Sequence, residues 1–199
     1  MKKLIWFTTI TILFLVFISP AVLALGIKLI PGGDQPGYNF NQRLIIYGER
    51  VVTQKFVSED VNLSAIATSI RNPNLKNKKD ITLILKDQNM NIVRTSVING
   101  QNLQDGDFVK FVFDPIPDSK NKVYFFILAS PEAGPEETIE VFYSRSMPNW
   151  IEEYSYEKNT YPGGLPIVLY FKPASKLAVI KDIYTNLGSR FLPQGFRKP

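Results

Sequence analysis

Residues 145–164 combine several aromatic side chains with several charged ones, and this mixture has the chemistry to bind a sugar. A sugar ring stacks its apolar face on an aromatic ring, while charged side chains bind its hydroxyl groups. The alternative is that the rings fold back over the protein core, because each carries a large apolar surface. The candidate ligand-binding residues are Trp150, Tyr154, Tyr156 and Tyr161.

Two pairs of carboxylates are close enough in sequence to be considered for glycoside hydrolysis, which needs two acids flanking the scissile bond. Asp114 and Asp118 flank Pro115-Ile116-Pro117, and Glu152 is adjacent to Glu153. Asp114 and Asp118 are more simply explained as turn residues that accept hydrogen bonds from nearby backbone amides. Adjacent residues such as Glu152 and Glu153 point apart on either kind of backbone. We therefore expect a protein without enzymatic activity.

The sequence contains no His and no Cys. This excludes Ser-His-Asp and Cys-His catalysis, His-liganded metals, thiolate zinc sites and disulfides. Calcium, which binds oxygen ligands, stays open as a structural ion, and Asp105-Gly106-Asp107 is the nearest match to a calcium loop. A hairpin turn explains that tripeptide better, so no cofactor and no metal are predicted.

The charge balance argues against a nucleic-acid partner. Lys and Arg number 23 against 18 Asp and Glu, and the basic residues are spread evenly. The one basic cluster, formed by Lys76, Lys78 and Lys79, is followed by Asp80 and is typical of a solvated loop.

Residues 1–25 form an export signal. Lys2 and Lys3 precede an uncharged run from Leu4 to Leu25, which is long enough to cross a hydrocarbon core that needs about 20 residues. Pro20 is expected to break the helix, and Val22-Leu23-Ala24 fits a signal-peptidase site. Two interpretations remain, a cleaved signal peptide or a retained signal anchor. In both the rest of the chain is exported, either secreted or anchored at the membrane.

Short runs rich in Val, Ile, Thr, Phe and Tyr follow, and several alternate with period 2, as strands do. Ile81, Leu83 and Leu85 give one such alternation. Turn residues separate the runs: 87–91 should close a hairpin, and Pro115 and Pro117 should end the strand at Phe113. The nine predicted strands are 44–47, 50–57, 61–71, 80–86, 92–98, 107–113, 122–129, 138–144 and 166–172.

This spacing predicts an all-β protein, an antiparallel β-sandwich of jelly-roll type over residues 44–173. Residues 26–43 are a turn-rich spacer, 145–164 a long connection, and 193–199 an unstructured tail. Residues 174–192 are expected to form a short amphipathic helix whose apolar stripe is Leu177, Ile180, Tyr184, Leu187 and Phe191. The stripe could pack on the domain or a partner, which we favour, or lie on a membrane surface.

The segment from Phe111 to Pro131, with Phe-Asp-Pro-Ile-Pro-Asp-Ser and a closing Ser-Pro, resembles a segment of galactose-binding-like jelly-roll domains in bacterial extracytoplasmic proteins. Three further stretches match in order, namely Gln54-Lys55-Phe56, the strand from Asn62 to Ile66, and Tyr161-Pro162-Gly163-Gly164. The likeness covers roughly residues 44–172. Such domains occur beside membrane spans, often in multi-span glycosyltransferases that use lipid-linked sugars. With one span at most, this chain resembles a free-standing or singly anchored accessory domain.

The sequence therefore predicts a non-enzymatic extracytoplasmic module that binds a glycan or another component of the bacterial cell envelope. The alternative is an accessory or structural subunit that docks on a membrane enzyme such as a glycosyltransferase. The expected partners are an envelope glycan or a membrane protein, and the membrane itself if residues 1–25 are not cleaved.

Overall fold

The computed structural model describes residues 2–32, 42–103, 108–145 and 147–191. The chain divides into two compact units, one formed by residues 1–30 and 173–199 and the other by residues 31–172. The tripeptide 105–107 that was considered for calcium, residues 33–41 of the spacer 26–43 and the tail 193–199 lie outside the described residues.

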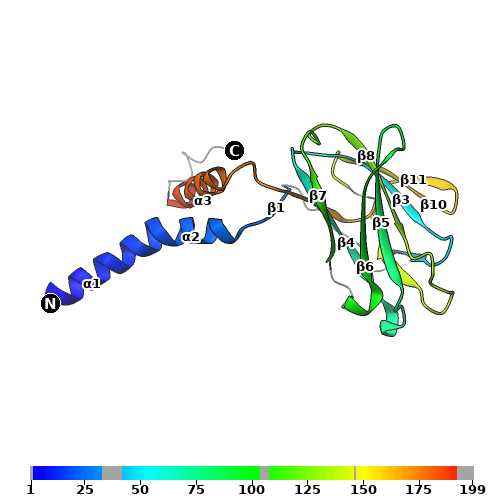
Figure 1. Ribbon diagram of the computed structural model, residues 1–199, viewed down its shortest axis with the longest axis horizontal. Coiled ribbons are helices and arrows are strands. Elements are labelled where there is room, and N and C mark those ends of the chain that lie inside the picture. Colours follow the sequence, from blue (N-terminus) through cyan, green and yellow to red (C-terminus); the bar gives the residue numbers. More distant parts are fainter. Residues whose placement is uncertain (1, 33–41, 104–107, 146, 192–199) are drawn as a thin grey trace. The chain divides into compact units, whose positions relative to one another are not determined.

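The larger unit consists of two antiparallel sheets that face each other (Figure 1). One sheet has the order β1-β12-β4-β9-β2, with β7 on the other side of β4, and the second has the order β11-β10-β3-β8-β5-β6. The strands are β1 (Ile30–Pro31), β2 (Arg43–Ile46), β3 (Val52–Val57), β4 (Leu63–Arg71), β5 (Asp80–Asp87), β6 (Ile92–Asn99), β7 (Phe108–Ile116), β8 (Val123–Ala129), β9 (Ile139–Phe142), β10 (Ile151–Tyr156), β11 (Asn159–Pro162) and β12 (Ile167–Phe171). The predicted antiparallel arrangement in two sheets is confirmed.

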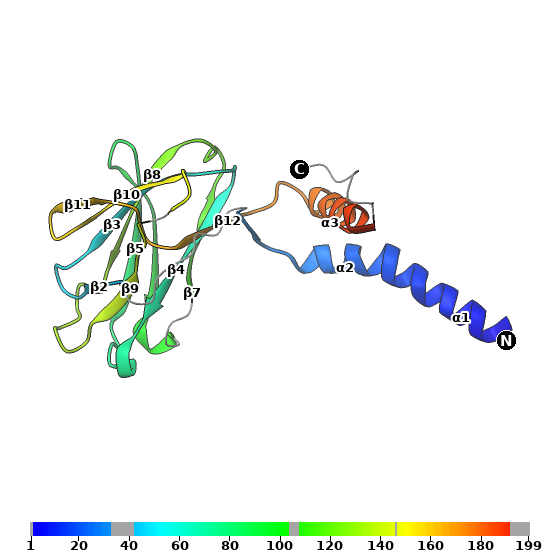
Figure 2. The same cartoon turned by 180° about the vertical axis from the view of Figure 1, so that it is seen from behind.

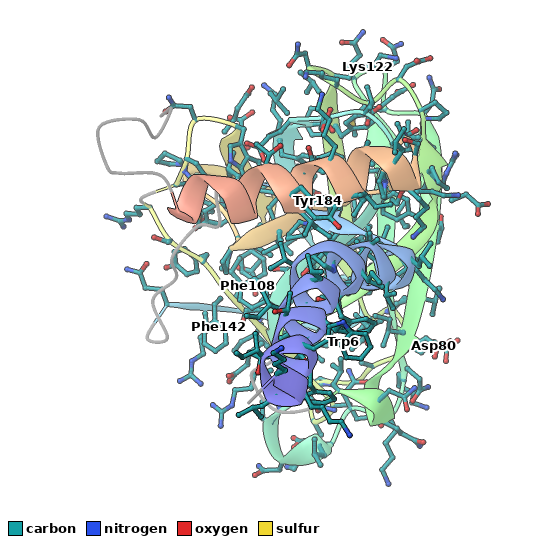
Figure 3. All side chains as sticks on the ribbon, turned by 90° about the vertical axis from the view of Figure 1, so that its left-hand side faces the viewer. Trp6, Asp80, Phe108, Lys122, Phe142 and Tyr184 are labelled. Atoms are coloured by element: carbon teal, nitrogen blue, oxygen red, sulfur yellow. The ribbon has the colours of Figure 1, made fainter. Side chains whose placement is uncertain are left out.

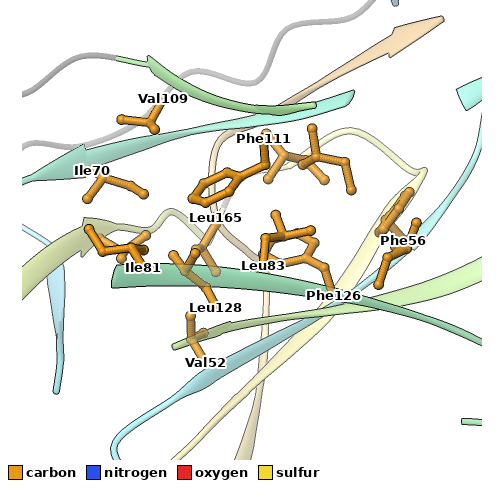
Figure 4. Packing of buried hydrophobic residues seen from close by; sticks show 14 of the residues in the cluster. Val52, Phe56, Ile70, Ile81, Leu83, Val109, Phe111, Phe126, Leu128 and Leu165 are labelled. Atoms are coloured by element: carbon orange, nitrogen blue, oxygen red, sulfur yellow. The ribbon is translucent and has the colours of Figure 1, made fainter. Parts of the chain in front are cut away.

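The core lies between the sheets because alternate residues of each strand point inward. Ile81, Leu83 and Leu85 of β5 are fully buried, as the period-2 pattern predicts, and they meet Phe111 of β7 and Phe126 of β8 (Figure 4). Burial of each such side chain stabilises the fold by roughly 1.5–3 kcal/mol. This core holds the sandwich together without any disulfide.

Two expectations about strand ends need correction. Residues 145–164 are not a long loop, because 151–156 and 159–162 pair as the hairpin β10–β11. Strand β7 does not end at Phe113 but continues through Pro115 to Ile116. Among the described strands β7 pairs with β4 alone, so its outer edge has no ladder from which a proline could remove a donor.

The smaller unit begins with one helical segment made of α1 (Lys2–Leu13), the π-helical turn η1 (Phe14–Ile18) and α2 (Ser19–Gly26). Its apolar side chains project around the whole circumference, Trp6 among them (Figure 3). The segment is long and apolar enough to cross a membrane, with a mean hydropathy of 2.3. Pro20 does not break it, contrary to expectation. In the π-turn just before Pro20 the amide of Ser19 donates to the carbonyl of Phe14, and this wider turn makes room for the proline ring.

Helix α3 (Lys176–Phe191) is close to the predicted range, and it contacts α2 within the same unit. Val179 is 2% exposed, whereas Leu177 of the expected stripe is 74% exposed. The stripe is therefore not the packed face at this end of the helix. The Lys176 ammonium donates to the backbone carbonyls of Ala24, Leu25 and Ile27, which end α2.

Candidate functional site

The β10–β11 hairpin brings three of the four candidate aromatic residues together. Tyr154 and Tyr161 are directly opposite each other in the ladder, and their rings stack with centroids 5.3 Å apart. Tyr143, which follows β9 in the other sheet, packs on Tyr154 with centroids 5.5 Å apart. Tyr156 lies two residues from Tyr154 in β10 and so shares its face of the strand.

These rings surround a pocket of about 330 Å³ at one lateral edge of the sandwich. Strand β2 ends one sheet on this side, and β10 and β11 end the other (Figure 2). Tyr154 is 5% exposed and forms the inner wall, whereas Tyr161 is 40% exposed and offers a ring to solvent. The lining residues are Leu44, Tyr143, Arg145, Tyr154, Tyr156, Tyr161 and Pro162.

Tyr156 ties the two sheets together beside the pocket. Its hydroxyl donates a 2.7 Å hydrogen bond to the carbonyl of Ile45 in β2. Desolvation, followed by the negative charge of Glu157, raises the pKa of Tyr156 above its ordinary value. Since the phenol stays neutral and holds this bond, the distance between β2 and β10 is fixed.

Gln54 of β3 supports the pocket from below. Its side-chain amide donates to the carbonyls of Lys55 and Glu153, and its Oε1 accepts a 2.9 Å hydrogen bond from the amide of Leu165. Gln54 is fully buried, so each of these bonds replaces one that water would have made. A single side chain thus fixes β10 and the segment that leaves β11.

The two glycines after Tyr161 allow that segment to approach the chain beside Tyr143. Gly164 exchanges both backbone hydrogen bonds with Ser144. A Cβ on Gly163, which has a φ of +99°, would lie 2.3 Å from the carbonyl oxygen of Ser144. A Cβ on Gly164 would lie 2.4 Å from Oε1 of Gln54. Tyr161-Pro162-Gly163-Gly164 is therefore the segment that presents Tyr161 at the pocket.

The crowded rings change the ionisation of Tyr154. Desolvation raises the pKa of its phenol to about 12, and nearby Tyr143 and Tyr161 contribute in the same direction. The positive charge of Arg145 opposes this rise. The hydroxyl of Tyr154 is thus protonated at neutral pH, and Arg145 is the one cationic residue in the lining.

Trp150 lies elsewhere. Its ring packs against the sandwich core, as expected for an aromatic cover residue, and its backbone carbonyl accepts a hydrogen bond from Val57. Its indole Nε1 is buried, with no hydrogen-bond partner in the described residues. The structure therefore groups Tyr154, Tyr156 and Tyr161 but leaves Trp150 outside the pocket.

The carboxylates considered for catalysis are exposed. Asp114 lies on β7 and Asp118 in the turn that follows, both open to solvent. Glu152 and Glu153 lie at an irregularity of β10, where Glu152 forms an ion pair with Lys55. Within residues 2–32, 42–103, 108–145 and 147–191, no cluster of three or more acidic side chains could hold a metal ion.

Tyr143 and Arg145 are pocket residues that the sequence reasoning did not select. Tyr143 belongs to a predicted strand, where its alternation indicated a core residue. Arg145 opens the supposed loop and carries no motif of its own. Only the pairing of Ser144 with Gly164, far apart in sequence, brings Arg145 to the tyrosines.

Comparison with known protein families gives no matching family, and comparison with curated proteins gives no significant relative.

Proposed function

We propose that this chain is an exported β-sandwich protein, held at the membrane by its N-terminal helix, that binds a saccharide of the cell envelope without transforming it. The observation that carries this proposal is the pocket at the lateral edge of the sandwich. There Tyr161 is exposed and stacked on the buried Tyr154. A jelly-roll relationship to galactose-binding-like domains belongs to the same proposal and rests on the sequence resemblance alone.

The pocket has the features of a small-molecule site. Its volume of about 330 Å³ is at the lower end of the range of about 300–1,000 Å³ that such sites cover. Tyr161 offers the aromatic surface on which the apolar face of a sugar stacks. The hydroxyls of Tyr143 and Tyr161 and the guanidinium of Arg145 can hydrogen-bond to sugar hydroxyls. The lining has no nucleophile paired with a base, which favours binding over turnover.

The test is binding of envelope oligosaccharides to the full chain in nanodiscs, measured by calorimetry. We expect Tyr161→Ala to abolish binding and the fold to persist, because this ring is partly exposed. Tyr170→Ala is the control, since Tyr170 lies in β12 and stacks with Lys110 away from the pocket. Failure of every envelope saccharide to bind at millimolar concentration would refute the proposal. Co-purification of a multi-span enzyme together with that failure would favour the accessory-subunit alternative.

We further propose that the N-terminal helix is retained as an anchor. The bond that a signal peptidase would cut follows Ala24, which is helical and fully buried. Its carbonyl accepts a hydrogen bond from Lys176, and peptide bonds that are cut readily are exposed and unpaired. Mass spectrometry of the exported protein should find the intact N-terminal segment. An N-terminus at Leu25 would refute retention and leave the saccharide proposal untouched.

A further inference from the structure

Arg145 differs from the other arginines of the sandwich in its partners. Within residues 42–103, 108–145 and 147–172, the remaining arginines bind carboxylates or backbone carbonyls, and Arg145 binds neither. Arg43 and Arg71 pair with Glu140, Arg50 pairs with Glu157, and Arg94 donates to the carbonyls of Asp114 and Pro115. Among the described residues, the guanidinium of Arg145 therefore has N–H donors without a carboxylate or carbonyl acceptor.

The backbone holds Arg145 at the pocket. Ser144 and Gly164 exchange hydrogen bonds of 2.9 and 3.0 Å, and Arg145 follows directly. A Cβ on Gly163 would lie 2.9 Å from the Cα of Arg145, so the two segments are in contact. The backbone of Arg145 is thus held by the same segment that presents Tyr161.

The pocket contains no counter-charge. Its lining consists of one leucine, four tyrosines, one proline and Arg145, with no acidic side chain. The phenol of Tyr154, whose pKa the charge of Arg145 influences, stays protonated at neutral pH, because burial raises its pKa to about 12. A ligand in this pocket therefore meets one positive charge that no lining group neutralises.

We infer that the saccharide bound here is acidic and carries a carboxylate, as a uronic acid does. This inference rests on the proposed function of the pocket and names its substrate class. A guanidinium presents paired donors that match the two oxygens of a carboxylate, and such charge-assisted bonds are stronger than bonds to a neutral hydroxyl. The ring of the same sugar would lie on Tyr161, so that one residue binds the charge and the other the apolar face.

The experiment compares three probes on the full chain in nanodiscs of zwitterionic lipid: trigalacturonic acid, its methyl ester and inorganic phosphate. The ester keeps the rings and removes the charge. We expect the acid to bind at least about tenfold more tightly than the ester, since a hydrogen bond to a charged group contributes about 1.5–3 kcal/mol. Phosphate alone should compete weakly, because it has no ring to stack.

Arg145→Gln should lower the affinity for the acid much more than the affinity for the ester, and so abolish the preference for the acid. Arg71→Gln removes the same charge from β4, outside the pocket, and should keep the preference. Equal affinities of the wild-type protein for acid and ester would overturn the inference while the proposed function stands. Equal effects of the two variants, or displacement of the acid by phosphate at similar concentration, would also overturn it. Absence of binding by both saccharides would overturn the inference, whereas the proposed function itself is refuted only if every envelope saccharide fails to bind at millimolar concentration.

Discussion

The side chain of Gln54 packs closely against Gly164, and this contact is possible only because residue 164 has no side chain. Oε1 of Gln54 occupies the space that a Cβ of residue 164 would need, at 2.4 Å. The second close atom is Cγ2 of Ile151, at 2.6 Å, and it belongs to a buried core residue. Neither neighbour can move freely, because Gln54 is held by three hydrogen bonds and Ile151 is packed in the core. The pocket is therefore sensitive to a single methyl group at its base.

We expect Gly164→Ala to reduce the free energy of unfolding by about 1–3 kcal/mol, the usual cost of overpacking. Urea denaturation of the full chain measures this. Gly134→Ala is the matched control, because nothing lies within 4 Å of the Cβ that it would add. The control should be neutral or slightly stabilising. Equal stability of Gly164→Ala and the wild-type protein would contradict the contact described above.

The raised pKa of Tyr154 makes stability depend on alkaline pH. The unfolded phenol ionises near pH 10, whereas the folded one ionises at about 12. The unfolded state therefore loses its proton first. The contribution of Tyr154 to stability is complete below pH 10 and is lost as the pH rises from 10 towards 12.

Tyr154→Phe should accordingly flatten the fall in unfolding free energy over this pH range, and it should remove the last-titrating component of the tyrosinate absorbance. Tyr170→Phe serves as the comparison and should leave that component in place. An unchanged titration in Tyr154→Phe would show that another tyrosine is the late one.

At the scale of elements, the β10–β11 hairpin turns on two residues that rarely occupy such positions. Glu157 and Lys158 both have positive φ, 49° and 68°, as the central residues of a type I′ turn do. Asn-Gly is the common choice there, because other residues are strained in the left-handed region. The hairpin is held instead by its ladder and by the ion pair of Glu157 with Arg50.

Lys158→Gly should stabilise the protein by roughly 0.5–1 kcal/mol, since relief of strain exceeds the entropy that glycine adds to the unfolded chain. Glu157 and its ion pair stay intact in this variant. Lys120→Gly, at an exposed position whose φ is not positive, should destabilise the protein. Thermal unfolding of the two variants should shift in opposite directions, and a lower melting temperature for Lys158→Gly would contradict the strain argument.

The same hairpin marks the limit of what the sequence could predict. Strands such as β5 and β8 were predictable because they are rich in β-branched and aromatic residues and bury alternate side chains. Strand β10 has an irregularity at Glu152–Glu153 that breaks the alternation, and all four residues of β11 are exposed. No Asn-Gly turn lies between the two strands. Neither the alternation of apolar residues nor the turn residues therefore indicated a hairpin. The tyrosines could be selected by type, but Arg145 could not, because its place depends on pairing between distant segments.

Across the whole sandwich, the two lateral edges differ. On the β2 side the edge holds the tyrosine pocket. On the other side Arg94 and Ser96 of β6 donate to the carbonyls of Val112, Asp114 and Pro115 of β7 in the opposite sheet. The second edge is thus closed by side chains that reach between the sheets.

Arg94→Lys should weaken this closure, because a single ammonium cannot reproduce the two bonds that the guanidinium makes to separate carbonyls. We expect a loss of about 1–3 kcal/mol in the free energy of unfolding and faster amide exchange along β6 and β7. Arg43→Lys is the matched control. Arg43 makes a partly exposed ion pair, for which a loss below about 1 kcal/mol is usual. Comparable losses in the two variants would refute a special role for Arg94.

Strand β11 has a consequence for how copies of the chain meet one another. An open sheet edge can add a strand from another copy of the chain, which leads to aggregation. This edge is only four residues long, Asn159–Pro162, and its last residue has no amide hydrogen to donate. At the opposite end of the same sheet, the side chains of Arg94 and Ser96 in β6 reach across to carbonyls of β7. This sheet therefore offers another copy little edge to extend at β11, and the pocket beside β11 is not covered by such an extension.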